Sequence, residues 1–125
     1  MADSKSRGIK EIIQALKWSL QGLKAAFKYE ASFRLEVYLF IILIPIYIWL
    51  AESALQLWML IGSTFLVLLV EMINSAIEAA VDMVCGDKHH ELAGRAKDMG
   101  SAAVFMTQML VIFTWAIIAY QNYLR

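Results

Sequence analysis

Polar side chains interrupt the second long apolar run of this chain at a helical spacing. They follow the run Leu66–Val70 and are Glu71, Asn74, Ser75, Glu78 and Asp82, which we call the acidic stripe. On a helix that turns by about 100° per residue, all five lie on one face. Because a carboxylate beside a lipid bilayer is strongly disfavoured, an acidic stripe on an apolar helix indicates a functional site.

Carboxylates without histidine or cysteine partners nearby suit the chemistry of a hard metal ion. Mg²⁺ binds oxygen ligands, usually one or two protein carboxylates, and lets substrate phosphates complete its shell. Glu30 and Glu78 are the candidate pair, provided that the first helix returns beside the second. Glu71 lies at the apolar end of the stripe, about 10 Å from Glu78, and is a candidate general base. Three cations that could meet a phosphate follow the stripe: Lys88, Arg95 and Lys97.

The spacing alone leaves two classes of protein open. An intramembrane carboxylate fits a phosphoryl-transfer enzyme and a small proton-coupled transporter equally well. The chain has neither a Walker phosphate loop nor the glycine-rich loop of protein kinases. The basic residues also have a topological explanation, since cytoplasmic loops are rich in lysine and arginine. Cys85 is the only cysteine, which excludes an intrachain disulfide, and His89 and His90 lack a second histidine pair for zinc.

The composition predicts an integral membrane protein with a single domain. Hydrophobic residues make up 61% of the 125 residues, whereas soluble domains contain about 45–50%. The apolar pattern predicts a surface helix at about 8–29 and membrane helices at about 31–51, 55–84 and 98–121. A polar loop at 86–100 is expected between the second and third membrane helices. The predicted fold class is therefore all-α.

The first predicted helix is amphipathic. Apolar residues recur at three- and four-residue spacing from Ile9 to Phe27, with four lysines elsewhere on the helical wheel. A basic amphipathic helix of this kind lies in the plane of the membrane interface. A helix packed on a soluble core is the alternative, but the rest of the chain offers no soluble core.

The basic residues predict the orientation in the membrane. Ten of the eleven lysines and arginines either precede the first span or lie between the second and third, and only Arg125 falls on the other side. The positive-inside rule then places the N-terminus and the 86–100 loop in the cytoplasm. The acidic stripe is expected at the cytoplasmic boundary of the membrane. A subunit with such short loops would close a site poorly, so we also expect an oligomer.

Three motifs resemble those of a known family. The stretches Val70–Ala80 and His90–Ala103 and the motif Glu30-Ala-Ser-Phe-Arg-Leu-Glu36 closely resemble the bacterial integral-membrane diacylglycerol kinases. The resemblance covers nearly the whole chain, including the amphipathic helix. It implies a homotrimer of three-span subunits in the bacterial inner membrane, with active sites shared between neighbours. It also implies ATP- and Mg²⁺-dependent phosphorylation of diacylglycerol, with no nucleic acid among the partners. A related branch phosphorylates undecaprenol, which is the alternative acceptor.

The resemblance implies a role for each matching residue. Glu71 looks like the catalytic base, and Glu30 and Glu78 look like the Mg²⁺ ligands. Lys97 would contact phosphate, and Asp98 the ribose or adenine. The residues that match nucleotide contacts are Lys10, Glu11, Trp18, Glu30, Glu78, Lys88, His89, His90, Lys97 and Asp98. The residues that match substrate-site positions are Ala15, Ser19, Lys24, Ala31, Ser32, Phe33, Arg34, Glu36, Glu71, Asn74, Ser101 and Trp115.

Two residues depart from the family pattern at the nucleotide contacts. Glu11 stands where the family often has a basic residue, a role that Lys10 could take over, and Trp18 stands where a tyrosine is common. The stretch Gly86–His90 is one residue longer than the family form. These departures concern the nucleotide contacts and leave the three glutamates of the predicted site in place.

Overall fold

The elements of the described chain are all helical. The computed structural model describes residues 4–124, with side chains from residue 8 onward. The helices are α1 (Ser4–Tyr29), α2 (Ala31–Leu50), α3 (Ala54–Cys85), α4 (Glu91–Ala119) and a π-helical turn, η1 (Tyr120–Leu124). No strand occurs within residues 4–124. The side chains of Lys5, Arg7 and Arg125, which entered the count of basic residues, lie outside the described part.

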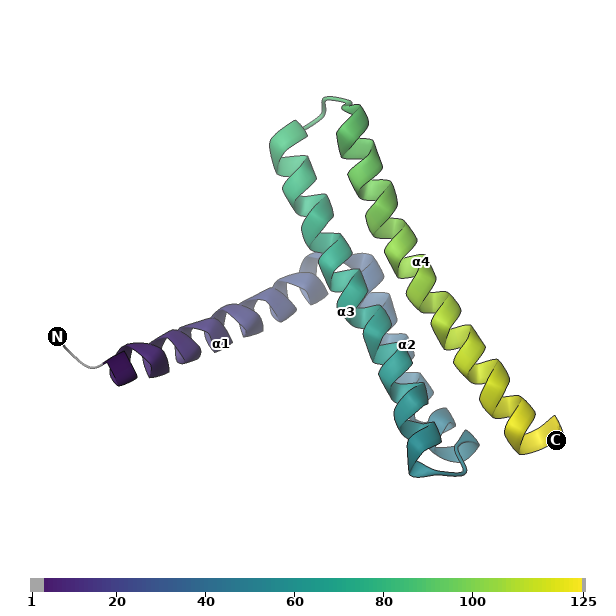
Figure 1. Ribbon diagram of the computed structural model, residues 1–125. Helices are drawn as coiled ribbons and strands as arrows, with labels where there is room; N and C mark the ends of the chain where they lie inside the picture. The colour runs from purple at the N-terminus through teal and green to yellow at the C-terminus, as the bar shows by residue number, and fades with distance from the viewer. Residues whose placement is uncertain (1–3, 125) are drawn as a thin grey trace.

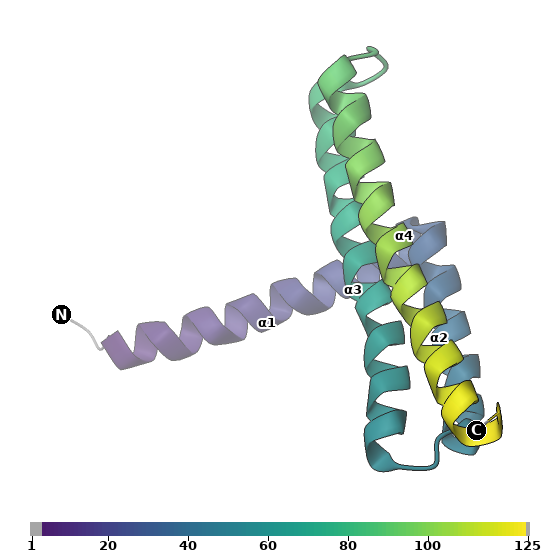
Figure 2. The ribbon, with the colours of Figure 1, turned by 45° about the vertical axis from the view of Figure 1, so that its right-hand side comes forward.

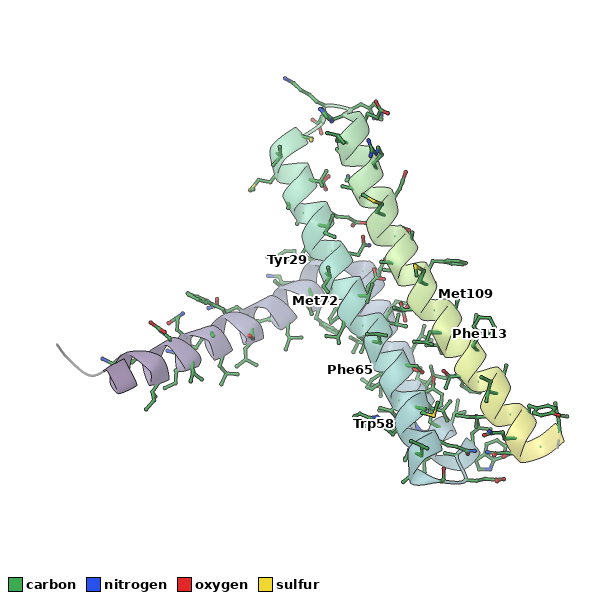
Figure 3. All side chains as sticks on the ribbon, viewed as in Figure 1. Tyr29, Trp58, Phe65, Met72, Met109 and Phe113 are labelled. Atoms are coloured by element: carbon green, nitrogen blue, oxygen red, sulfur yellow. The ribbon has the colours of Figure 1, made fainter. Side chains whose placement is uncertain are left out.

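Three of these helical segments are long and apolar enough to cross a membrane. They are Ala31–Leu50, Ala54–Cys85 and Glu91–Leu124. The prediction of an all-helical chain with three apolar spans is therefore confirmed. Large apolar side chains such as Trp58, Phe65 and Phe113 are exposed on their surfaces (Figure 3). Lipid accommodates such a surface, whereas a water-soluble monomer rarely exposes so much apolar area.

A corner at Glu30 separates α1 from α2. Glu30 has extended backbone torsions (φ −107°, ψ 102°), so the helix is broken for one residue. The Arg34 guanidinium donates to the carbonyl oxygens of Phe27 (2.9 Å) and Lys28 (3.1 Å), which lie in the last turn of α1, where carbonyls lack helical partners. As a result, α1 projects sideways from the other three helices (Figure 1, Figure 2).

The long helices α3 and α4 pack side by side as an antiparallel hairpin (Figure 1). Gly86 ends α3 with a left-handed backbone (φ 55°), a conformation that glycine adopts without strain. The His90 ring then accepts the Leu92 backbone N–H (3.2 Å) and caps the start of α4. The end of the hairpin extends past the α1–α2 corner, on the side away from α2 (Figure 1).

The polar connection between α3 and α4 is shorter than predicted. The sequence pattern predicted a loop over 86–100 and a membrane helix from about 98, but α4 begins at Glu91. Leu92, Ala93 and Ala96 explain this difference, because they recur at helical spacing and line an apolar groove with the end of α3. The polar residues of 91–100 therefore belong to a helix beyond the corner and not to a loop.

A buried hydrogen-bond chain joins α2, α3 and α4 in the half of the bundle far from the corner. The Trp115 indole N–H donates to the Tyr47 hydroxyl at 3.0 Å, and the hydroxyls of Tyr47 and Thr64 lie 2.6 Å apart. The Thr64 hydroxyl donates to the Leu60 carbonyl oxygen (2.9 Å). Its oxygen therefore accepts the hydrogen bond from the Tyr47 hydroxyl. Each of these polar groups is thus satisfied, as a membrane interior requires.

Replacing Tyr47 with phenylalanine should destabilise the protein by about 0.6–2 kcal/mol, the range for hydrogen bonds between membrane helices. The variant leaves the Trp115 N–H without an acceptor and removes the donor to Thr64. Thermal inactivation in detergent measures the loss. Tyr38→Phe is the matched control, because the Tyr38 ring is half exposed and packs edge-on against Phe27. Equal loss in both variants would show that the hydrogen-bond chain adds no stability.

Candidate active site

A cavity of about 390 Å³ lies between the start of α2 and the facing sides of α3 and α4. Its lining residues are Glu30, Ser32, Glu71, Asn74, Ser75, Glu78, Ser101, Val104, Phe105 and Gln108. Four of the five members of the acidic stripe therefore share one cavity. Glu30 reaches it because α2 begins beside α3 after the corner, although α1 itself projects away and does not return beside the other helices.

Burial differs along the cavity. Glu71, Asn74 and Ser75 are each only 7% exposed, whereas Glu30 and Glu78 are half-buried. Glu71 lies two helical turns from Glu78 toward the middle of α3. The cavity therefore has a buried carboxylate at its apolar end and two more accessible carboxylates, of which Glu78 lies toward the end of the hairpin.

Asn74 connects the acidic stripe to α4. Its side-chain N–H donates to Glu78 Oε1 at 3.4 Å, while its Oδ1 is buried without a hydrogen-bond partner among the described residues. Gly100 on α4 faces this oxygen, and a Cβ at that position would overlap it. Glycine thus lets α4 approach α3 closely without displacing the Asn74 carboxamide, and α4 covers the unpaired oxygen.

Gly100→Ala should push the Asn74 carboxamide away from Glu78. We expect a loss of about 1–3 kcal/mol from overpacking and a fall in turnover of about tenfold or more from the displaced site. Gly62→Ala is the control, because a Cβ at Gly62 meets no atom within 4 Å. Thermal unfolding and phosphate-transfer assays measure the two effects. Full activity in the alanine variant at position 100 would mean that the position of Asn74 does not matter.

The oxygen donors of this cavity fit a magnesium ion that shares its shell with phosphate. Glu30 and Glu78, which both line the cavity and are only half-buried, supply two carboxylates. Within residues 8–124, no group of three His, Cys, Asp or Glu side chains could hold a metal ion by itself. Mg²⁺ is usually held by one or two carboxylates together with substrate phosphates, so this donor set suits an ion that arrives with a nucleotide.

Asp82, the fifth member of the acidic stripe, does not line this cavity and instead contacts Lys97 of α4. Asp82 Oδ1 lies 2.6 Å from Lys97 Nζ, and both side chains are partly exposed. The two residues also line a smaller pocket, of about 120 Å³, at the connection between α3 and α4. Lys88, His89 and His90 line the same pocket, so the structure gathers four of the predicted nucleotide contacts there.

Other predicted site residues line neither pocket in the single chain. Those on α1 are exposed and project away with that helix: Lys10, Glu11, Ala15, Trp18, Ser19 and Lys24. Asp98 is exposed on α4. On α2, Ala31 is exposed and Glu36 is half-buried, and neither lines the 390 Å³ cavity.

Three predicted substrate contacts have structural roles in this chain. Trp115 packs on Tyr47 (ring centroids 5.3 Å apart) in the far half of the bundle, well away from Glu71. Phe33 is buried in a cluster with Ala26 and Leu68. The Arg34 guanidinium holds the end of α1, as described above. The structure therefore does not bring these three side chains into the cavity.

The sequence argument missed the part of the cavity wall that α4 supplies beyond Ser101. Val104, Phe105 and Gln108 follow Ser101 by three, four and seven residues, so they continue its helical face. Gln108 could have been found, because it is a polar residue inside the third apolar run. Val104 and Phe105 carry no such signal.

Comparison with known proteins identifies the family. Residues 17–119 match the family described as prokaryotic diacylglycerol kinase. A diacylglycerol kinase of Haemophilus influenzae is 46% identical over 111 residues, which cover 89% of this chain and 93% of the relative. One from Escherichia coli is 44% identical over 116 residues (93% and 94%), and one from Pseudomonas aeruginosa is 45% identical over 111 residues (89% of each). This chain belongs to the prokaryotic diacylglycerol kinase family.

Proposed function

We propose that this protein transfers the γ-phosphate of ATP to the free hydroxyl of diacylglycerol and so forms phosphatidic acid. One observation carries the proposal: a single cavity holds a buried carboxylate, Glu71, at its apolar end and two accessible carboxylates, Glu30 and Glu78, at its polar end. The names of the relatives, which are diacylglycerol kinases, support the same acceptor. A site with these two ends suits one lipid substrate and one soluble substrate.

Glu71 acts as the general base in this proposal. It takes the proton from the lipid hydroxyl as that oxygen attacks the γ-phosphorus, and the bond to the bridging oxygen of ADP breaks. Asn74 donates a hydrogen bond to its neighbour Glu78 and so helps to position that carboxylate. Because little covalent chemistry falls to the protein in phosphoryl transfer, these residues act mainly by positioning.

The polar end of the cavity binds the charged part of ATP. Glu30 and Glu78 would hold Mg²⁺, which when bound neutralises phosphate charge. Lys97 exchanges its contact with Asp82 for the triphosphate of ATP, which as a whole carries more negative charge than one carboxylate. Lys88, His89 and His90 would lie around the base or ribose, since they share a pocket with Lys97.

The proposal includes a setting in the membrane. The end of the α3–α4 hairpin lies on the cytoplasmic side of the bacterial inner membrane, where ATP is available. The amphipathic helix α1 lies in the interface on the same side of the membrane. The enzyme works as a homotrimer with shared sites. The projection of α1 away from α3 and α4 (Figure 2) supports sharing, because none of its predicted site residues lines the cavity of its own chain.

Nucleotides labelled at different phosphates test this function in mixed micelles. Label from γ-labelled ATP should appear on diacylglycerol, whereas label from α-labelled ATP should stay on ADP. Chelation of Mg²⁺ should stop the transfer. No label on the lipid would reject the kinase proposal, and a single-chain mass in detergent would reject the shared assembly.

A further inference from the structure

The apolar end of the cavity carries a polar side chain with no assigned role. Gln108 lines the cavity together with Glu71, although it lies within the apolar part of α4. Gly100 faces Asn74, and α4 runs antiparallel to α3. At 1.5 Å per residue, Gln108 lies about 12 Å past Gly100, whereas Glu71 lies only about 4.5 Å past Asn74. Gln108 is therefore deeper in the membrane than the proposed base.

The neighbouring threonines of α4 donate hydrogen bonds to backbone carbonyls of the same helix, whereas the Gln108 carboxamide has no such partner. Thr107 donates to the Val104 carbonyl (2.6 Å) and Thr114 to the Leu110 carbonyl (2.8 Å). The side-chain hydrogen bonds within residues 8–124 include none to the Gln108 carboxamide. An amide in a hydrocarbon surrounding without a partner is strongly unfavourable. Gln108 is exposed in the single chain, so a partner from outside the chain can reach its carboxamide.

The place of Gln108 indicates which partner that is. Side chains on a helix lean toward the N-terminus, which for α4 is the hairpin end. Gln108 thus leans toward Glu71, inside the cavity that would hold the lipid acceptor. In a diacylglycerol, ester carbonyls follow the reacting hydroxyl along the glycerol backbone. They accept hydrogen bonds but donate none, and the carboxamide NH₂ is a donor of matching depth.

We propose that Gln108 is a specificity-determining residue that donates a hydrogen bond to an ester carbonyl of the acceptor lipid. The bond places the free hydroxyl against Glu71 and selects ester-linked lipids over lipids of the same shape that lack a carbonyl. The inference rests on the proposed function, since it names a contact of the same acceptor. A site built to hydrogen-bond its substrate discriminates strongly against an analogue without the bonding group.

Two acceptors of equal chain length test the contact: a diester diacylglycerol and the corresponding dialkyl ether glycerol. The wild-type protein should phosphorylate the ester with a kcat/KM about tenfold or more above that of the ether. Gln108→Leu should remove this preference by lowering kcat/KM for the ester alone, with the KM for ATP unchanged. Met106→Leu is the control, because Met106 is exposed and does not line the cavity.

The outcomes separate this inference from the function on which it rests. Equal use of ester and ether by the wild-type protein would overturn the Gln108 contact, whether or not the leucine variant folds. An equal fall for both lipids in Gln108→Leu would also overturn it and would indicate a contact with a neighbouring chain. Phosphate on neither lipid in the wild-type protein would instead reject the kinase function.

Discussion

Glu71→Gln is expected to lower phosphate transfer to diacylglycerol by about 10²–10⁴-fold, the usual contribution of a general base. Glutamine keeps the size of the side chain but cannot take the hydroxyl proton. Fold and assembly should persist, because the Glu71 carboxylate makes no ion pair among the described residues. Steady-state turnover in mixed micelles with saturating ATP and lipid measures the effect, and the oligomeric mass in detergent checks the assembly.

Glu52→Gln is the matched control for this variant. Glu52 is an exposed glutamate in the connection between α2 and α3, at the end of the bundle far from the cavity. Its replacement should leave turnover unchanged. If Glu71→Gln kept most of its activity, another group would have to accept the proton.

Replacing Glu30 or Glu78 with glutamine should raise the Mg²⁺ concentration needed for half-maximal activity by about tenfold or more, the scale of changes at metal-binding sites. A neutral amide is a weaker ligand for a hard cation than a carboxylate. The fold should tolerate both changes. A glutamine at position 78 still offers an oxygen to the Asn74 N–H, and the Glu30 carboxylate makes no ion pair among the described residues. Activity titrated against Mg²⁺ at fixed ATP measures the shift.

The magnesium effect should be specific to the two cavity glutamates. Glu52→Gln should titrate as the wild-type protein does. A midpoint that does not move in either cavity variant would exclude both residues as ligands. A lower maximal rate with the same midpoint would point to a role in positioning and not in metal binding.

The acidic stripe could be predicted because helical geometry alone places its members on one face. Glu71, Asn74, Ser75 and Glu78 line one cavity for this reason. The sequence could not show that Glu30 joins this cavity, because its position depends on the corner between α1 and α2. That corner relies on the contacts of Arg34 with the end of α1, which no pattern of apolar residues reveals.

Other features escaped prediction because they depend on packing between helices. Polarity suggested a loop at 91–100, but the chain there is helical along the end of α3. Trp115 matched a substrate position, yet its indole is used in a hydrogen bond to Tyr47. The need for glycine at position 100 arises only because α4 passes directly over Asn74. The spacing of residues in the sequence describes one helix at a time and does not show which residues of different helices come into contact.

The role of Asp82 also became visible only in three dimensions. The sequence analysis assigned no function to this residue. Its contact with Lys97 joins α3 to α4 next to the pocket of predicted nucleotide contacts. Exposed ion pairs contribute little stability, so the contact matters more for where Lys97 lies than for the fold.

Competition between two acceptors tests the central claim most directly. Purified protein is given γ-labelled ATP and Mg²⁺ in micelles that hold equal amounts of diacylglycerol and undecaprenol. Nearly all of the label should appear in phosphatidic acid, and Glu71→Gln should reduce that product by at least about 100-fold. Label mainly on undecaprenol would contradict the proposed acceptor, and label on neither lipid would contradict the whole account of this cavity as a phosphoryl-transfer site.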